Sequence, residues 1–300
     1  TFTVAIREPA PIGINFSHRN IARYGDTTGV ISVVLSGGTP PYSIYASGGN
    51  LLTEQDEFIT LSDDKVPFSN LAEGTYTFTV KDAHECRAEA SQEILQPDAP
   101  LTLVFNKDAS STNIRCHGDT TGELYVAAQG GWGDYTYTFR GIENRNGVFK
   151  NLKATTTPEV EMIYVKDNYR VTDSIDIRIT EPLPLRANII EKQSLSAVAC
   201  HNDSTAYISC EVSGGIEPYR TSTNGEQWLH STELSHLPAQ EYTIYVQDSN
   251  NCEVNLHYSV SQPPAITIQL TAEHTFCEQS IGSIAATVAG GTGEYTYRWL

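Results

Sequence analysis

One pattern occurs four times along the chain and limits the folds that are open to it. Each copy has a run in which every second residue is apolar, then a pair of glycines, then a second alternating run rich in tyrosine. Alternation with period two describes a β-strand with one buried face, and paired glycines allow a tight turn that side chains would forbid. The glycine pairs stand at positions 37–38, 130–131, 214–215 and 290–291, which are 93, 84 and 76 residues apart. The chain is therefore predicted to be an array of repeats.

A second signal marks the end of each copy. A Gln-Pro or Glu-Pro pair precedes the first strand of every copy, and proline closes a strand because it has no N–H to donate. The pairs are Glu8-Pro9, Gln96-Pro97, Glu181-Pro182 and Gln262-Pro263. We therefore expect repeat 1 at 10–97, repeat 2 at 98–182 and repeat 3 at 183–263. Residues 1–9 are expected to form the last strand of a preceding repeat and 264–300 the first strands of a fourth, so the chain is interpreted as a slice of a longer protein.

The strand pattern also indicates the fold class. Each repeat has about seven short strands with turn signals between them, which is typical of an immunoglobulin-like sandwich. Tyr76 and Tyr242 begin the penultimate strand of repeats 1 and 3, as the tyrosine corner of that fold does, whereas repeat 2 has Glu161 there. We predict an all-β protein made of tandem immunoglobulin-like, PKD-like β-sandwiches placed end to end.

Composition excludes several classes of function. The chain has 36 acidic and 19 basic residues and a net charge of −17, which disfavours binding to nucleic acid and to anionic membrane surfaces. No apolar run approaches the ~20 residues of a membrane helix, so no membrane insertion is expected. An acidic exterior favours solubility.

No arrangement of residues predicts catalysis. The eight histidines lack metal-ligand spacing, and no nucleophile motif or phosphate-binding loop is present. The last turn of each repeat begins with an aspartate, namely Asp82, Asp167 or Asp248. Together with loop aspartates, these residues are candidates for binding calcium, although turn formation also explains them. We expect no enzyme activity, no metal site and no cofactor.

The combined motifs resemble the SprB repeat. The order is Cys…Asp-x-x-Gly, a strand, Gly-Gly-x-x-x-Tyr-x-Tyr-x-Trp, then Leu-x-x-Gly-x-Tyr-x-x-x-Val-x-Asp-x-x-x-Cys, ending in Gln/Glu-Pro. The resemblance covers the whole chain, with Arg23 and Val171 in place of cysteines. It is also similar to the PKD domain.

The resemblance implies a function. SprB repeats occur in very large surface adhesins of gliding Bacteroidota, so it implies a non-catalytic stalk segment of an extracellular filament anchored at the outer membrane and exported by the type IX system. The partners it implies are neighbouring repeats of the same chain, components of the gliding and secretion machinery that contact other regions, and surface polysaccharide. Two alternatives stay open: a carbohydrate-binding array, and a spacer in a large secreted hydrolase.

The same resemblance suggests a modification. Four Asp-Ser/Thr motifs look like Bacteroidota O-glycosylation sites, and simple turn chemistry is the competing explanation. The candidate residues are Thr27, Thr120, Ser174 and Ser204.

The six cysteines allow a prediction of disulfides in an exported protein. Alignment places Cys116, Cys200 and Cys277 in the loop after the first strand, and Cys86 and Cys252 in the last hairpin. These two places lie at opposite ends of one sandwich, beyond the ~7 Å Cα limit of a disulfide. When sandwiches stack end to end, the first loop of one faces the last hairpin of the next. The favoured bond is therefore Cys116–Cys252, with Cys210 as a core thiol.

That arrangement leaves Cys86, Cys200 and Cys277 without a partner in this chain. A second arrangement, Cys86–Cys116 with Cys252–Cys277, and a third with no bonds both stay open.

Overall fold

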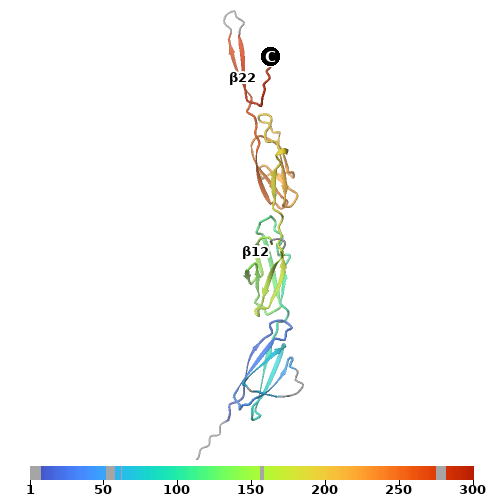
Figure 1. Cartoon of the computed structure of the whole chain (residues 1–300), viewed down its shortest axis with the longest axis vertical. Helices are drawn as coiled ribbons and strands as arrows, with labels where there is room; N and C mark the ends of the chain where they lie inside the picture. The colour runs from blue at the N-terminus through green and yellow to red at the C-terminus, as the bar shows by residue number, and fades with distance from the viewer. Residues whose placement is uncertain (1–7, 52–57, 62, 156–158, 275–281) are drawn as a thin grey trace, which may run out of the picture. The chain divides into compact units, whose positions relative to one another are not determined.

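The structure, a computed structural model, describes residues 8–51, 58–61, 63–155, 159–274 and 282–300. Among these residues the chain is built from β-strands, and the single helical element is a 3-10 turn, η1 (Glu191–Gln193). None of the described helices has the length and apolar character needed to cross a membrane. The protein is an all-β array of immunoglobulin-like sandwiches, as the alternating runs predict (Figure 1).

Contacts between Cα atoms divide the chain into two compact units. The first holds 1–111, 123–150 and 155–178, and the second holds 112–122, 151–154 and 179–300. Two loops that belong to repeat 2 by sequence, 112–122 and 151–154, thus cluster with repeat 3. The repeat boundaries themselves stay a prediction.

The first sandwich packs a three-stranded sheet on a four-stranded sheet. The strands are, in spatial order, β1 (Gly13–Arg19), β2 (Gly29–Ser36) and β5 (Lys65–Leu71) in one sheet, and β4 (Ile59–Thr60), β3 (Ser43–Gly48), β6 (Gly74–Lys81) and β7 (Arg87–Ile94) in the other. Both sheets contribute to one core, in which Ile31, Tyr76 and Phe78 are fully buried. The burial of β2 alternates residue by residue, as one buried face requires.

The second sandwich repeats this architecture. One sheet has β12 (Val148–Leu152), β9 (Gly122–Gln129) and β8 (Thr102–Phe105), and the other has β11 (Ile142–Asn144), β10 (Thr136–Phe139), β13 (Glu161–Lys166) and β14 (Thr172–Ile177). The rings of Phe139 and Phe149 join the two sheets with centroids 5.7 Å apart in an edge-on contact, the geometry that aromatic pairs favour.

The third sandwich has two three-stranded sheets. They contain β15 (Arg186–Ile189), β16 (Ala206–Ser213) and β18 (Glu233–Leu237), and β17 (Arg220–Ser222), β19 (Glu241–Gln247) and β20 (Glu253–Ser259). Cys210 of β16 is 4% exposed inside this core, where the alignment with Val33 and Val126 predicts it.

A two-stranded hairpin follows, with β21 (Thr267–Glu273) and β22 (Ser283–Ala289). The expected strand after the fourth glycine pair does not form, since residues 292–300 contain no strand. In the three sandwiches the strand at this place (β3, β10 or β17) pairs with β6, β13 or β19. The assignment of residues 264–300 to a fourth repeat stays a prediction.

Two sandwiches contain a tyrosine corner. The hydroxyl of Tyr76 donates to the carbonyl of Ala72 at 2.9 Å, and that of Tyr242 donates to Pro238 at 2.8 Å. Each bond reaches back four residues from a tyrosine near the start of the penultimate strand, so it fixes the turn that enters the strand.

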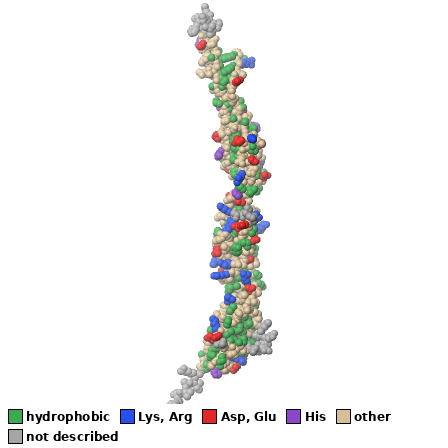
Figure 2. All heavy atoms as spheres, in the orientation of Figure 1, with side chains coloured by type: hydrophobic (Ala, Val, Ile, Leu, Met, Phe, Trp, Pro, Cys, Tyr) green, Lys and Arg blue, Asp and Glu red, His purple; other side chains and the backbone are tan. Residues whose placement is uncertain are grey.

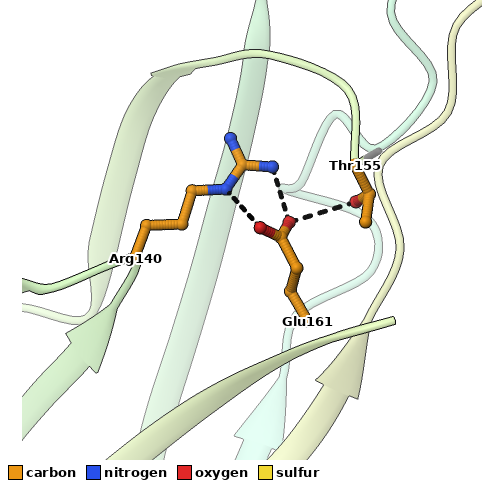
Figure 3. Close-up of polar contacts among 3 residues, drawn as sticks. All are labelled: Arg140, Thr155 and Glu161. Atoms are coloured by element: carbon orange, nitrogen blue, oxygen red, sulfur yellow. Dashed lines mark hydrogen bonds and ion pairs between the residues drawn. The ribbon is translucent and has the colours of Figure 1, made fainter. Parts of the chain in front are cut away.

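The second sandwich has a charged cluster at this place instead (Figure 3). Glu161 begins β13, where the other two sandwiches have tyrosine, and its carboxylate accepts hydrogen bonds from Arg140 Nε at 2.8 Å and from the Thr155 hydroxyl at 3.1 Å. The Arg140 Nη2 atom lies 2.5 Å from the second carboxylate oxygen, which makes the pair bidentate. These donors, with Arg140 foremost, hold the pKa of Glu161 below its usual value although burial acts in the opposite direction.

The surface carries mixed charge. On the face shown in Figure 2, acidic and basic side chains are scattered among hydrophobic and other side chains. Such mixing favours a soluble exterior.

We expect Glu161→Gln to lower the free energy of unfolding by about 1 kcal/mol, because it removes the charge from a half-buried bidentate pair. Since the folded-state pKa is depressed, the contribution is present above the ordinary pKa of Glu and is lost as pH falls through the depressed value. Urea unfolding at neutral and acidic pH measures both effects. Glu123→Gln, which breaks the more exposed pair with Lys150, is the matched control and should cost less. An equal loss from both variants would contradict the special role of Glu161.

Candidate functional site: the junctions between repeats

One buried aspartate organises the end of each sandwich that carries the glycine turn. In repeat 3, Asp248 is 1% exposed. One carboxylate oxygen accepts the N–H groups of Asn250 and Cys252, both at 2.9 Å, and the other accepts the N–H of Ile216 at 2.9 Å. The aspartate therefore ties the last hairpin to the Gly214-Gly215 turn.

The glycine pair is required for this close approach. Gly214 and Gly215 have φ of 72° and 58°, angles that favour glycine. A Cβ on Gly214 would lie 2.0 Å from the Pro184 carbonyl oxygen, and one on Gly215 would lie 2.7 Å from the Asp248 carboxylate. The Gly-Gly pair and the distant aspartate that recur in the sequence thus act together in one structural feature, the hydrogen-bonded turn.

The other repeats contain the same feature. Asp82 accepts the N–H groups of Thr39, His84 and Cys86 at 3.0, 2.9 and 3.0 Å. Desolvation pushes the pKa of Asp82 upward, but the three N–H donors and the nearby His84 together bring that pKa below its usual value.

These bonds also bear on the calcium hypothesis. The oxygens of the turn aspartates are occupied by backbone donors, which is the turn-forming role. Among the described residues no group of three or more His, Cys, Asp or Glu side chains is placed to hold a metal ion.

The Gln/Glu-Pro pairs clamp the first loop of their own repeat. Glu181 Oε2 accepts the N–H of Gly118 at 2.7 Å, and Gln262 Oε1 accepts the N–H of Asn202 at 2.7 Å. In repeat 1, Gln96 Oε1 accepts the N–H of Gly25 at 2.8 Å. In these three repeats the polar residue before the proline thus fixes the first loop, a role that the sequence pattern alone does not reveal.

The junction of repeats 2 and 3, which we call the second junction, is covalent. Cys116 and Cys252 form a disulfide with a sequence separation of 136. Their Cα atoms lie 5.6 Å apart, within the ~7 Å limit for a disulfide. Both cysteines lie in the second compact unit. Beside the bond, Arg115 Nε donates to the Asn250 carbonyl at 2.6 Å, and Asn250 Nδ2 donates to the Arg115 carbonyl at 2.8 Å.

The junction of repeats 1 and 2, which we call the first junction, has other chemistry. Trp132, the residue directly after the Gly130-Gly131 turn, donates its indole N–H to the Ile21 carbonyl at 2.9 Å. Its ring stacks on Tyr169 with centroids 4.7 Å apart and an interplanar angle of 22°. All of these residues lie in the first compact unit.

The remaining described cysteines are free thiols. Cys86 and Cys200 are exposed, whereas burial of Cys210 raises the pKa of its thiol to about 11. Cys277 lies outside the described residues. The arrangement Cys86–Cys116 with Cys252–Cys277 and the arrangement with no bonds are both wrong, because Cys116 and Cys252 are bonded to each other.

The glycosylation candidates have two kinds of environment. Thr27, Thr120 and Ser204 are exposed in loops, but Ser174 is half-buried in β14. All four stay a prediction.

We expect iodoacetamide at pH 8 without reductant to label Cys86 and Cys200 and to spare Cys210, since only the thiolate reacts and a thiol with a pKa of about 11 is ~0.1% ionised there. Cys116 and Cys252 should react only after reduction. Peptide mass mapping measures each site, with urea-unfolded protein as the control for reagent access. Labelling of Cys116 in the unreduced protein would contradict the assignment.

We expect Asp248→Asn to lower the free energy of unfolding by about 2 kcal/mol, because a carboxylate that accepts three buried N–H groups becomes a neutral amide with one acceptor oxygen. Thermal unfolding measures the loss. Asp176→Asn, at an exposed strand position, is the control and should change little. A loss as small as the control's would show that the turn does not depend on the carboxylate.

Comparison with known proteins supports a repeat assignment. Residues 109–143 match the SprB repeat family model, and this segment contains Cys116 and Trp132. No curated protein matches the sequence. The family match supports the interpretation of the chain as a repeat segment of a cell-surface protein.

Several solved structures match the chain at low sequence identity. Dpr2 Ig1-Ig2 in complex with DIP-Theta Ig1-Ig3 is 10% identical with a TM-score of 0.35, over 84% of this chain and 99% of that one. A 1.5-MDa bacterial ice-binding adhesin is 12% identical with a TM-score of 0.32, over 84% and 98%. SGBP-B of Bacteroides ovatus, in complex with a mixed-linkage heptasaccharide, is 11% identical with a TM-score of 0.19, over 90% and 75%.

Proposed function

We propose that this chain is a non-catalytic stalk segment of a large secreted surface adhesin, which transmits force between an anchor and a binding region elsewhere in the protein. The observation that carries the proposal is the disulfide across the second junction. A repeat protein gains stability from contacts between neighbours, and here one such contact is covalent.

The path of the disulfide explains its mechanical value. A pull on the two ends of the chain passes through the bond, so the 135 residues between Cys116 and Cys252, which are separated by 136 positions, are shielded from extension while it is intact. At about 3.5 Å per extended residue, roughly 480 Å of chain is held back. Such shielding benefits a protein that works under tension.

The match to the SprB repeat supports the finer assignment. We propose that the adhesin takes part in gliding motility and surface attachment, that it is exported by the type IX system, and that it forms an extracellular filament anchored at the outer membrane. Its partners would be neighbouring repeats, the gliding and secretion machinery through other regions, and surface polysaccharide. Thr27, Thr120, Ser174 and Ser204 are the proposed O-glycosylation sites.

Replacement of the segment tests the stalk function. In the cells that produce the protein, residues 98–263 are replaced by two unrelated immunoglobulin-like sandwiches of similar length. We expect surface display and attachment to be retained, because a stalk supplies length and strength rather than recognition. Antibody labelling of intact cells and adhesion under flow are the measurements.

An in-frame deletion of 98–263 is the control for length. Loss of attachment after replacement, with display intact, would contradict the stalk function and favour a ligand-binding array. A glycan array probed with the isolated chain would then identify the class of sugar.

A further inference from the structure

The two junctions have equivalent positions but different residues. Cys116 lies two residues after Ile114, and its counterpart two residues after Ile21 is Arg23. Cys252 lies four residues after Asp248, and its counterpart four residues after Asp167 is Val171. The local backbone is the same, since Asp167 accepts the N–H of Val171 at 2.9 Å and Asp248 accepts the N–H of Cys252 at 2.9 Å.

The two substituted residues border the same cavity. Arg23 and Val171 line a space of about 340 Å³ in the first junction, together with Pro97, Pro100 and Asp173. A space of this size has room for water. The place that a disulfide fills in the second junction is therefore open to solvent in the first.

Trp132 closes the first junction in another way. Its indole bond to Ile21 and its stack on Tyr169 are the contacts described above. At the equivalent position after the glycine pair, repeat 3 has Ile216, which is 44% exposed. Asn250, the counterpart of Tyr169, instead bonds Arg115. The Trp132 contacts are thus found at the first junction and the disulfide at the second.

We propose that the two junctions differ in whether they can open. The first junction, closed by Trp132, opens and closes reversibly, whereas the second is locked by the Cys116–Cys252 bond. The first junction is closed by one hydrogen bond and one aromatic stack, which are weak and reversible contacts, and the adjacent space has room for water. A covalent bond does not open without reduction. This proposal goes beyond the stalk function and its mechanical meaning rests on it, since under tension the first junction would give way before any sandwich unfolds.

The test transfers the lock from one junction to the other. The double variant Arg23→Cys/Val171→Cys is made in a Cys86→Ser/Cys200→Ser background, so that no exposed thiol competes. Oxidised glutathione takes up the two electrons and two protons as the new S–S bond forms. The single variants Arg23→Cys and Val171→Cys are controls that cannot form it, and thermal unfolding confirms that each variant folds.

The readout is hydrogen–deuterium exchange of the Trp132 indole N–H, followed by NMR and assigned by its loss in Trp132→Phe. We expect the oxidised double variant to form the bond and to slow this exchange about tenfold or more, because exchange needs the junction to open. Reduction should restore the original rate. Cys116→Ser/Cys252→Ser, which unlocks the second junction, should leave Trp132 unchanged.

Three outcomes would overturn the proposal. If the new cysteines stay free, the two junctions do not share one geometry. If the bond forms and the indole exchange is unchanged, the first junction does not open in the wild-type chain. If unlocking the second junction speeds Trp132 exchange as much as reduction does, the two junctions do not act separately. None of these measurements applies load or ligand, so each outcome leaves the replacement test of the stalk function to be decided by itself.

Discussion

The organisation of this chain depends on a buried carboxylate that accepts hydrogen bonds from backbone N–H groups. Asp248 and its counterparts Asp82 and Asp167 accept backbone N–H groups from two loops that are distant in sequence. A buried charge is costly unless hydrogen bonds replace its hydration. The aspartate therefore keeps both loops close to its carboxylate, where their N–H groups can donate to it. The same carboxylate that completes a sandwich therefore also sets the positions of the residues at the junction, including Cys252.

The junctions use this shared frame for different chemistry. Because the frame is fixed by backbone donors and by glycines, the side chains that project from it can change without loss of the fold. One junction has a disulfide with an arginine–asparagine pair, and the other has a tryptophan against a tyrosine and a carbonyl group. The sandwiches themselves show the same freedom, since a charged cluster around Glu161 stands where Tyr76 and Tyr242 form corners.

The sequence predicts structural features that recur in every repeat, but it does not predict contacts that occur only once. Alternation and the glycine pairs predict strands such as β2, β9, β16 and β22, because period two and positive φ are local properties. Alignment of the repeats also selects the Cys116–Cys252 pair. The contact of Trp132 with Ile21 spans 111 residues and has no counterpart to align with. The only sequence signal is a tryptophan after a glycine pair, where Thr39, Ile216 and Thr292 stand elsewhere. Residues 295–299 alternate but form no strand, since a local pattern does not specify the neighbour with which a strand must pair.

The spacing of the disulfide has a consequence for biogenesis. The hairpin that carries Cys252 exists only after β19 and β20 have paired, and it lies 136 residues beyond Cys116. A chain that emerges from its N-terminus presents the loop with Cys116 long before that partner is available. The two cysteines are therefore brought together by the folded third sandwich and not by nearness in the sequence. Until that sandwich has folded, Cys116 is one more accessible thiol beside Cys86, and correct pairing relies on the order in which the domains mature rather than on proximity along the chain.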